Sequence, residues 1–240
     1  MSVTPTKAMV LAAGLGLRMR PLTEKTPKPL IPIAGRPLLD HVLDRLGDAG
    51  VTDAIVNVHY LPDQIIDHVA PRTTPHVTIS DERDQVLGTG GGVAKALPLL
   101  GAAPFFHVNS DTVWIDGVQS NLGRLADAFD PARMDILLLM APTASSIGYS
   151  GRGDYSMLAD GALRKRREHQ VVPFVYAGAA IMSPAIFADA PAGEFSLTKM
   201  FDSANEQERL FGLRLDGVWM HVGTPDAIPA AEEAFLESVA

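Results

Sequence analysis

The sequence predicts an α/β protein with a Rossmann-like, mixed but mainly parallel sheet that is flanked by helices. Residues 8–13 and 136–140 are continuous apolar runs of strand length, as is typical of strands buried on both faces of a parallel sheet. Residues 36–50 instead repeat aliphatic side chains at helical spacing, and Gly47 and Gly50 suit the end of a helix. Strands and helices that alternate in this way predict βαβ crossovers.

The remaining elements follow from the same patterns. We predict strands at residues 54–58, 77–80, 105–108 and 175–182, and helices at residues 62–69, 93–100, 121–129, 197–207 and 225–238. After residue 140 the pattern is mixed, because Asp160-Gly161 and Asp216-Gly217 each separate two apolar segments and predict hairpins. We expect a single domain, residues 1–240, with a nucleotide-binding half at 1–140 and an acceptor-binding half at 141–240.

The composition excludes several classes of protein. A formal net charge of -8 argues against a general nucleic-acid binder. The chain has no cysteine, which excludes disulfides, zinc sites with thiolate ligands and cysteine nucleophiles. The N-terminal residues lack the apolar stretch of a signal peptide, and the longest apolar runs are too short to span a membrane. We therefore expect a soluble cytoplasmic protein with no nucleic-acid and no membrane partner.

The loop after the first predicted strand has the residues of an anion site. Gly14 and Gly16 free backbone N–H groups and allow a phosphate to approach the backbone closely. Pro27 and Pro29 stiffen the backbone on either side of Lys28. The loop also carries Arg18, Arg20 and Lys25. Such a cationic loop suits a triphosphate; the alternative is a tight turn with solvated charges. The glycine spacing fits neither the dinucleotide fingerprint nor a Walker loop, which argues against a dinucleotide-dependent oxidoreductase.

Two further segments have residues suited to binding. The glycines at residues 90–92 precede an apolar helix, and they either leave room for a ligand against the backbone or form a flexible hairpin or helix cap. Asn109-Ser110-Asp111 follows a buried strand, where a carboxylate can bind a metal ion; the alternative is that Asp111 caps the next helix. Carboxylate, water and phosphate oxygens are the ligands that magnesium prefers.

These motifs together resemble a known family. The segment LAAGLGLRMRPLTEKTPKPL closely resembles the signature LAAGxGxRxxPLTxxxPKPL of the nucleoside-diphosphate-sugar pyrophosphorylases, and the resemblance continues through GRPLLDHVLDRL, LGTGGG, VNSD and WMHVGTP. Within this family, the short length and the segments LGTGGGVAKALPLLG and GRGDYSM resemble most the N-acetylmuramate 1-phosphate uridylyltransferases of bacterial cell-wall recycling. The length leaves no room for the C-terminal β-helix or dimerisation region of longer members, so we expect that a monomer can function.

The resemblance implies the fold of the nucleotide-diphospho-sugar transferases. It also implies a reaction in which an NTP and a sugar 1-phosphate give an NDP-sugar and pyrophosphate, and the subfamily that it resembles most uses UTP and N-acetylmuramate 1-phosphate. The sugar phosphate attacks the α-phosphorus in line, so catalysis rests on positioning and charge neutralisation. Arg18 would bind the leaving phosphates, Lys28 the α-phosphate and the attacking phosphate, and Asp111 a metal ion. The implied nucleotide-binding residues are Leu11, Ala12, Ala13, Gly14, Gly16, Glu82 (or its neighbour Arg83), Gly88, Thr89 and Asn109.

The resemblance also implies a sugar-binding set. Its members are Gly153, Asp154, Glu168 and Gly178. The four cations at residues 164–167 lie where other members have an EKP-like segment. They either form a solvated face or attract the 1-phosphate or the lactyl carboxylate of a muramic acid.

One position departs from the family pattern. The second metal ligand of the family is the aspartate of WxDxGT, and His221 stands there in this chain. Imidazole is a poor magnesium ligand and a better one for softer ions. His221 could therefore bind Mn²⁺ or another divalent ion, or hydrogen-bond a phosphate or the sugar while Asp111 binds Mg²⁺, or mark an impaired site. The alternatives to uridylylation are mannose-1-phosphate guanylylation, glucose-1-phosphate thymidylylation and a catalytically silent nucleotide-sugar-binding regulatory protein.

Overall fold

The computed structural model describes residues 4–238 and confirms the predicted α/β architecture. Its strands are β1 (Lys7–Leu11), β2 (Pro32–Ile33), β3 (Arg36–Pro37), β4 (Asp53–Val58), β5 (His76–Asp81), β6 (Phe105–Asn109), β7 (Thr112–Asp116), β8 (Ile136–Pro142), β9 (Tyr155–Met157), β10 (Leu163–Lys165), β11 (Phe174–Met182), β12 (Leu210–Arg214) and β13 (Gly217–His221). Its α-helices are α1 (Leu38–Asp48), α2 (Pro62–Val69), α3 (Gly88–Leu100), α4 (Asn121–Ala128), α5 (Thr198–Glu206) and α6 (Ile228–Ser238). Short 3₁₀ helices are η1 (Leu17–Met19), η2 (Leu22–Glu24), η3 (Lys28–Leu30), η4 (Pro184–Phe187) and η5 (Pro225–Ala227).

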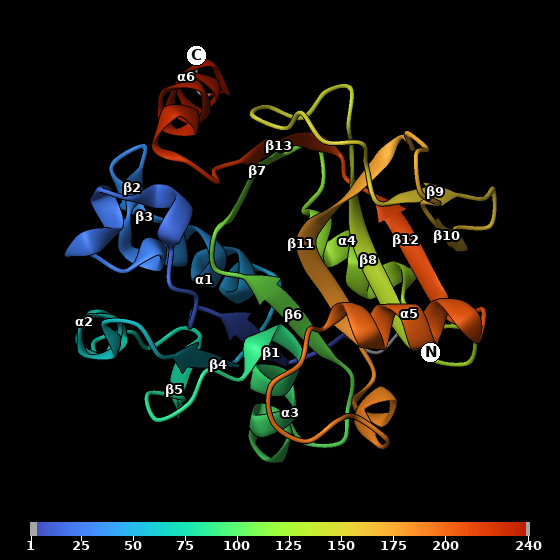
Figure 1. Ribbon diagram of the computed structural model, residues 1–240, viewed down its shortest axis with the longest axis horizontal. Coiled ribbons are helices and arrows are strands. Elements are labelled where there is room, and N and C mark those ends of the chain that lie inside the picture. Colours follow the sequence, from blue (N-terminus) through green and yellow to red (C-terminus); the bar gives the residue numbers. More distant parts are fainter. Residues whose placement is uncertain (1–3, 239–240) are drawn as a thin grey trace.

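The main sheet is mixed, as the sequence predicts. Within the described residues it has nine strands, and its longest path has the order β10-β9-β11-β6-β1-β4-β5 (Figure 1). β1 pairs in parallel with β4 and β6, and β4 pairs in parallel with β5. β11 runs antiparallel to both β6 and β8, whereas β12 is parallel to β8. The carboxyl ends of β1, β4 and β6 therefore meet at one edge of the sheet.

Two hydrophobic layers enclose this sheet. On one face, α1 and α4 bury Leu39 and Leu125 against strand residues such as Val10. On the other face, α3 and α5 bury Val93 and Phe201. Successive side chains of β1 are all buried and enter opposite cores, with Ala8 and Val10 on one face and Met9 on the other, which explains why its apolar run is continuous.

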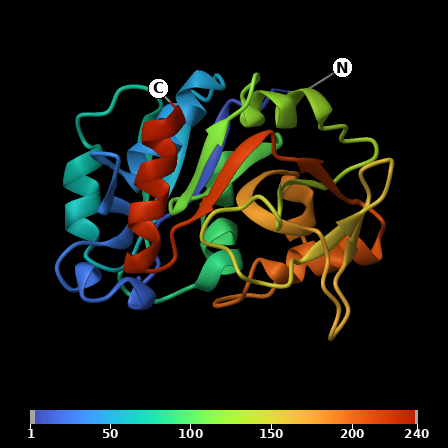
Figure 2. The same ribbon diagram turned by 90° about the horizontal axis from the view of Figure 1, so that it is seen from above.

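The C-terminal helix α6 covers a third, smaller cluster. Ala231 of α6 is fully buried with Met19, Ile33 and Met220, and Phe235 stacks on the ring of His41 at 5.2 Å between ring centroids. Figure 2 shows α6, in red, beside the blue N-terminal segment. The C-terminal segment thereby supports the cationic loop from outside. No helix within residues 4–238 has both the length and the apolar character to cross a membrane.

The predicted hairpin at Asp216-Gly217 is wrong. β12 enters the main sheet parallel to β8, whereas β13 leaves it and pairs antiparallel with β7, a strand that the sequence did not predict. The amide of Asn121 holds the junction, because its Nδ2 donates to the Asp216 carbonyl at 2.7 Å and its Oδ1 accepts from the Asp216 N–H at 2.9 Å. Gly217 has φ 109°, and a Cβ there would lie 2.0 Å from the Ile115 carbonyl oxygen. The dipeptide therefore directs the chain into a second sheet. The other predicted hairpin, β9 to β10, is confirmed.

The glycines at residues 90–92 have a packing role that the sequence did not indicate. They lie in the first turns of α3, which begins at Gly88 and not at residue 93. A Cβ at Gly90 would lie 2.3 Å from the ring of Phe195, and a Cβ at Gly91 would lie 2.3 Å from the carbonyl oxygen of Gly193. The absence of side chains lets the segment around Phe195 pack directly on the helix.

Candidate active site

A cavity of about 590 Å³ opens at the carboxyl ends of β1, β4 and β6. All of the predicted catalytic and nucleotide-binding residues line it: Leu11, Ala12, Ala13, Gly14, Gly16, Arg18, Lys28, Glu82, Gly88, Thr89, Asn109 and Asp111. Arg83 does not line it, because its side chain turns back to donate to the Asp81 carboxylate at 2.8 Å. The cavity has the size of a small-molecule site and lies where open α/β sheets bind ligands.

The loop after β1 is folded tightly enough to fix Lys28. Gly16 has φ 63°, and a Cβ there would lie 3.2 Å from the Cβ of Lys28 and 3.0 Å from the Thr23 methyl group. The Thr23 hydroxyl donates to the Gly16 carbonyl at 2.8 Å and ties the two ends of the loop together. Lys28 begins η3 between buried Pro27 and Pro29. The proline bracket therefore holds the lysine at the cavity wall with little backbone freedom.

Lys28 and Asp111 form an ion pair at the base of this cavity. The Lys28 Nζ donates to the Asp111 Oδ2 at 2.6 Å, and the two side chains are 12% and 38% exposed. Asp111 lies on the turn between β6 and β7, where the Ser110 N–H donates to the carbonyl of Leu11 at 3.0 Å. Asp111 therefore does not cap a helix. Its more exposed carboxylate is the part of the pair that faces an incoming ligand.

His221 and Arg18 meet beside this pair. A Cβ at Gly223 would lie 2.7 Å from the His221 Nε2 and 3.4 Å from the Arg18 Nη1. Burial lowers the pKa of His221, the nearby Arg18 and Lys28 cations lower it further, and the Asp111 carboxylate opposes the shift. The lowered pKa favours the neutral imidazole at neutral pH, and the cations around it favour binding of phosphate.

The donors around Asp111 suit a metal ion that arrives with its substrate. No group of three or more histidine, aspartate or glutamate side chains within residues 4–238 is arranged to hold a metal ion. Magnesium is commonly bound through one or two carboxylates together with phosphate oxygens and water. Asp111 supplies one such carboxylate, so the residues fit magnesium bound mainly by nucleotide phosphates and do not form a complete site by themselves.

The predicted sugar-binding residues lie in different places. Gly178 has φ 85° at an irregularity in the pairing of β11 with β8, and a Cβ there would lie 3.2 Å from the Asn109 Nδ2. Asp154 accepts from the Tyr176 N–H at 3.0 Å. Gly153 has φ 73° and lies against the carbonyl of Val172. Gly178 is thus buried behind the cavity residue Asn109 and does not itself line the cavity, whereas Asp154 and Gly153 support the neighbouring strands.

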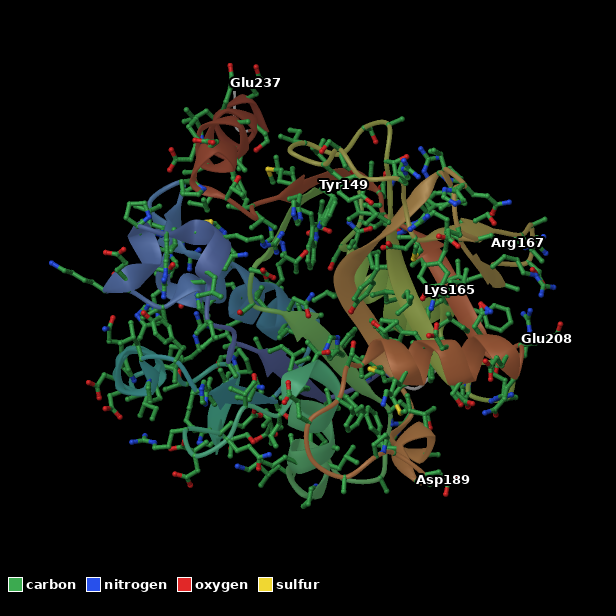
Figure 3. All side chains as sticks on the ribbon, viewed as in Figure 1. Tyr149, Lys165, Arg167, Asp189, Glu208 and Glu237 are labelled. Carbon is green, nitrogen blue, oxygen red and sulfur yellow. The ribbon has the colours of Figure 1, made fainter. Side chains whose placement is uncertain are left out.

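Glu168 is not brought to the cavity. Its side chain is 90% exposed, and its one ion-pair partner among the described residues is His169 at 3.7 Å. The preceding cations are largely used at the surface: Lys165 pairs with Asp202 at 2.6 Å, and the Arg166 Nε donates to the Gly153 carbonyl at 2.9 Å. Figure 3 shows Arg167 near the outer edge of the molecule and Lys165 inward of it, above the helix α5 that carries Asp202. This arrangement favours a solvated face for residues 164–167.

Sequence reasoning missed several residues of the cavity. Asn57 and His59, at and just beyond the end of β4, both line it, as do Leu15 and Val86. Asn57 is 2% exposed in a strand that is otherwise apolar after Asp53. A polar residue at the carboxyl end of a buried strand was the available signal, because buried polar groups require specific partners.

Comparison with known proteins identifies the family. Residues 8–186 match the family described as "MobA-like NTP transferase domain". The chain belongs to this family. The matched segment contains all but the first residue of β1, the cationic loop, Asp111 and most of the main sheet. The predicted membership of the nucleotidyltransferases is thereby confirmed.

Two relatives of this NTP transferase share most of their length with it. An N-acetylmuramate alpha-1-phosphate uridylyltransferase from Caulobacter vibrioides is 46% identical, with 99% of this chain and all of the relative aligned. A protein of the same name from Neisseria meningitidis serogroup B is 35% identical over 91% of this chain and 93% of its own. A solved structure of a putative glucose-1-phosphate thymidylyltransferase from Bacillus anthracis superposes with a TM-score of 0.80 at 15% identity, covering 95% of this chain and 94% of its own. This last similarity supports the fold alone.

Proposed function

We propose that this chain transfers a uridylyl group from UTP to N-acetylmuramate 1-phosphate, which yields UDP-N-acetylmuramate and pyrophosphate in the recycling of cell-wall sugars. The single observation that carries the chemistry is the Lys28–Asp111 pair, which joins the cationic loop to the end of β6 at 2.6 Å. The choice of substrates is supported by the names of the two relatives that align over nearly all of the chain.

The reaction requires the chain to neutralise charge and align two anions. An oxygen of the sugar phosphate attacks the α-phosphorus, and the bond from this phosphorus to the oxygen that bridges to the β-phosphate breaks as pyrophosphate leaves with the electron pair. Lys28 neutralises the negative charge on the α-phosphate and on the attacking phosphate, since it lies near the centre of the cluster. Arg18, on the adjacent η1, binds the departing phosphates. Positioning and electrostatic stabilisation suffice for such a transfer, and no covalent enzyme intermediate is needed.

Asp111 would hold magnesium together with phosphate oxygens of the nucleotide. When bound, the ion supplies positive charge to the triphosphate and so assists the departure of pyrophosphate. His221 donates a hydrogen bond to a phosphate in this proposal, because two of the three charged groups that act on it, Arg18 and Lys28, are cations that would bind the same phosphates. The same position would let it approach manganese or another soft ion, so the choice of metal is a direct test of its role.

The acceptor enters from the side of Asn109 and Gly178. Gly178 is buried, and a Cβ there would lie 2.9 Å from Thr112 and 3.2 Å from the Asn109 Nδ2, so the missing side chain lets the Asn109 amide take its place beside the cavity. All groups in this proposal come from one chain, so a monomer is sufficient. Nucleoside triphosphates and sugar phosphates are cytoplasmic metabolites, which supports a cytoplasmic enzyme.

Pyrophosphate release tests this proposal. The purified chain is incubated with ATP, CTP, GTP or UTP and with the 1-phosphates of N-acetylmuramate, N-acetylglucosamine, glucose or mannose, in magnesium or manganese. We expect the highest kcat/KM for UTP with N-acetylmuramate 1-phosphate. Release with no combination would overturn the enzymatic assignment in favour of a silent nucleotide-sugar-binding protein. A preference for GTP with mannose 1-phosphate, or for another pair, would keep the chemistry and replace the substrates.

A further inference from the structure

A second hollow lies at the carboxyl ends of β8 and β12. It has a volume of about 440 Å³ and shares no lining residue with the first cavity. β8 and β12 are parallel, and both run in the direction of β6, because β11 is antiparallel to β6 and to β8. Figure 1 shows α4 beside these two strands. The hollow therefore lies at the edge of the sheet where α/β proteins bind ligands.

Two guanidinium groups line this hollow and have no carboxylate partner. Neither Arg124 of α4 nor Arg214, the last residue of β12, forms an ion pair within residues 4–238. Arg209, just before the same strand, instead pairs with Asp135 at 2.9 Å. Two cations in one hollow repel each other, although the chain has a formal net charge of -8. An anion between them replaces this repulsion with attraction.

The side chain of Asn121 holds Arg124 in place. The Arg124 Nη1 donates to the Asn121 Oδ1 at 2.9 Å and to the Arg214 carbonyl at 3.0 Å. Both hydrogens of Nη1 are thereby used, whereas the donors on Nε and Nη2 have no partner in the part of the chain that the structure describes. The Nε–Nη2 edge of a guanidinium matches two oxygens of a phosphate. Because Asn121 is fully buried, the guanidinium is positioned before a ligand binds.

The hollow also contains an acceptor, the carboxylate of Asp216. Asn121 fixes the backbone of Asp216 through both its N–H and its carbonyl group. The side chain lies against Gly117, where a Cβ would be 2.3 Å from the Asp216 Oδ2. This carboxylate forms no ion pair with either arginine of the hollow in the described chain, so it can accept a hydrogen bond from a hydroxyl group. The hollow thus combines donors for a phosphate with an acceptor for a hydroxyl.

We propose that this second hollow binds a sugar phosphate, with the phosphate held by Arg124 and Arg214 and a sugar hydroxyl held by Asp216. The inference goes beyond the proposed function, because the transfer reaction does not use this hollow. Inorganic phosphate alone would satisfy the arginines, but it would leave Asp216 without a hydrogen-bond donor and bring two negative charges close together. A phosphate ester that carries hydroxyl groups satisfies both. Ser145, which also lines the hollow, adds a further hydroxyl.

Titration calorimetry with glucose 6-phosphate tests the site. This probe carries its phosphate on C6 and lacks the 1-phosphate that the transfer reaction uses. Arg214→Gln removes a cation from an exposed position, and Arg124→Gln removes the second. Each should weaken binding by roughly 10- to 100-fold, as for loss of a hydrogen bond between charged groups. Arg133→Gln is the matched control and should bind as the wild type, since its guanidinium lies beside β12, 5.1 Å from the Phe211 ring centroid, but outside the hollow.

The substitution Asp216→Asn separates a sugar phosphate from a simple anion. Loss of the negative charge should raise the affinity for inorganic phosphate, because the arginines then attract the anion without opposition. The same change weakens the acceptor for the sugar hydroxyl. The ratio of glucose 6-phosphate to inorganic phosphate affinity should therefore fall by roughly fivefold, the difference between a hydrogen bond to a charged acceptor and one to a neutral acceptor. Urea midpoints of each variant separate these effects from a loss of folding.

Three results would overturn the inference. The first is no binding of glucose 6-phosphate to the wild type, or equal affinity in the wild type, Arg124→Gln and Arg214→Gln. The second is loss of binding in Arg18→Gln alone, which would place the ligand in the first cavity. The third is an unchanged affinity ratio in Asp216→Asn, which would reduce the hollow to a simple anion site. Binding is measured without UTP and without turnover, so a wrong assignment of the transfer reaction would not alter these results.

Discussion

The Lys28–Asp111 ion pair predicts a competition between the lysine and a divalent cation. Without nucleotide, Lys28 occupies the carboxylate that we assign to the metal. A triphosphate draws Lys28 to its phosphates and frees Asp111, so the cation should bind tightly only with nucleotide. Removing the ammonium group should therefore strengthen cation binding to the nucleotide-free chain, although the same change abolishes most of the activity. The two effects have opposite signs, which separates them from a loss of folding.

The size of this effect follows from the geometry of the pair. At 2.6 Å, an effective dielectric constant of about 20 gives an attraction of about 6 kcal/mol before desolvation is subtracted. Because the Asp111 side chain is 38% exposed, we take a net value of about 1.5–3 kcal/mol, as for other hydrogen bonds between charged groups. Lys28→Met should then raise the affinity for Mn²⁺ by roughly 10- to 100-fold.

Electron paramagnetic resonance of free Mn²⁺ measures this affinity with and without UTP. Methionine keeps most of the length of the lysine side chain and removes its charge. Lys25→Met, in an exposed position of the same loop, is the matched control and should leave the affinity unchanged. Equal Mn²⁺ affinities for the wild type and Lys28→Met in the absence of nucleotide would refute the competition and the assignment of Asp111 as a ligand.

Three further predictions concern the rest of the site. His221→Ala should lower kcat/KM by about tenfold through loss of one hydrogen bond to phosphate and leave the ratio of magnesium to manganese activity unchanged; a changed ratio in the metal titration would make His221 a ligand. Burial raises the pKa of Glu82. As the pH falls through that raised pKa, the Glu82 carboxylate gains a proton and becomes a donor, so the ratio of UTP to CTP affinity should fall as the pH is lowered; a flat profile would contradict this. Gly92→Ala should lower the free energy of unfolding in urea by about 1–3 kcal/mol, since the added Cβ meets the Asn57 amide. Gly14→Ala is the control and should not lower it, because a Cβ at Gly14 meets no atom. Equal urea midpoints for the two variants would contradict this prediction.

The sequence predicted the elements whose burial is visible in a local pattern of apolar residues. The α2 helix has the predicted bounds, and β4, β5 and β8 differ from the predicted ranges by one or two residues at an end. The cationic loop was predictable because its chemistry is local: the prolines and Lys28 are neighbours in the chain. The arrangement of its cations around Asp111 follows from β1 and β6 being adjacent in a parallel sheet.

The errors arose where a contact between distant segments overrides a local pattern. Asp216-Gly217 has the composition of a hairpin turn, but the amide of Asn121 holds it for a change of sheet. The glycines before Val93 have the composition of a ligand-binding loop, but two of them pack against the segment around Phe195. The partners lie roughly a hundred residues away in both cases, so no window of the sequence contains both halves of the contact.

The two ends of the cavity are built on different physical principles, and this separates reaction from substrate choice. At one end, Arg18, Lys28 and Asp111 are charged groups that partly face solvent, and their effect extends over any triphosphate that enters. At the other end, the Asn57–Glu82 pair is buried, and its effect depends on the direction of a single hydrogen bond. A substitution in the buried pair should change which base is accepted and leave the transfer chemistry intact. The residues that we propose for catalysis are therefore recognisable from a short motif, whereas the bonding of the Asn57–Glu82 pair is seen only in the three-dimensional structure.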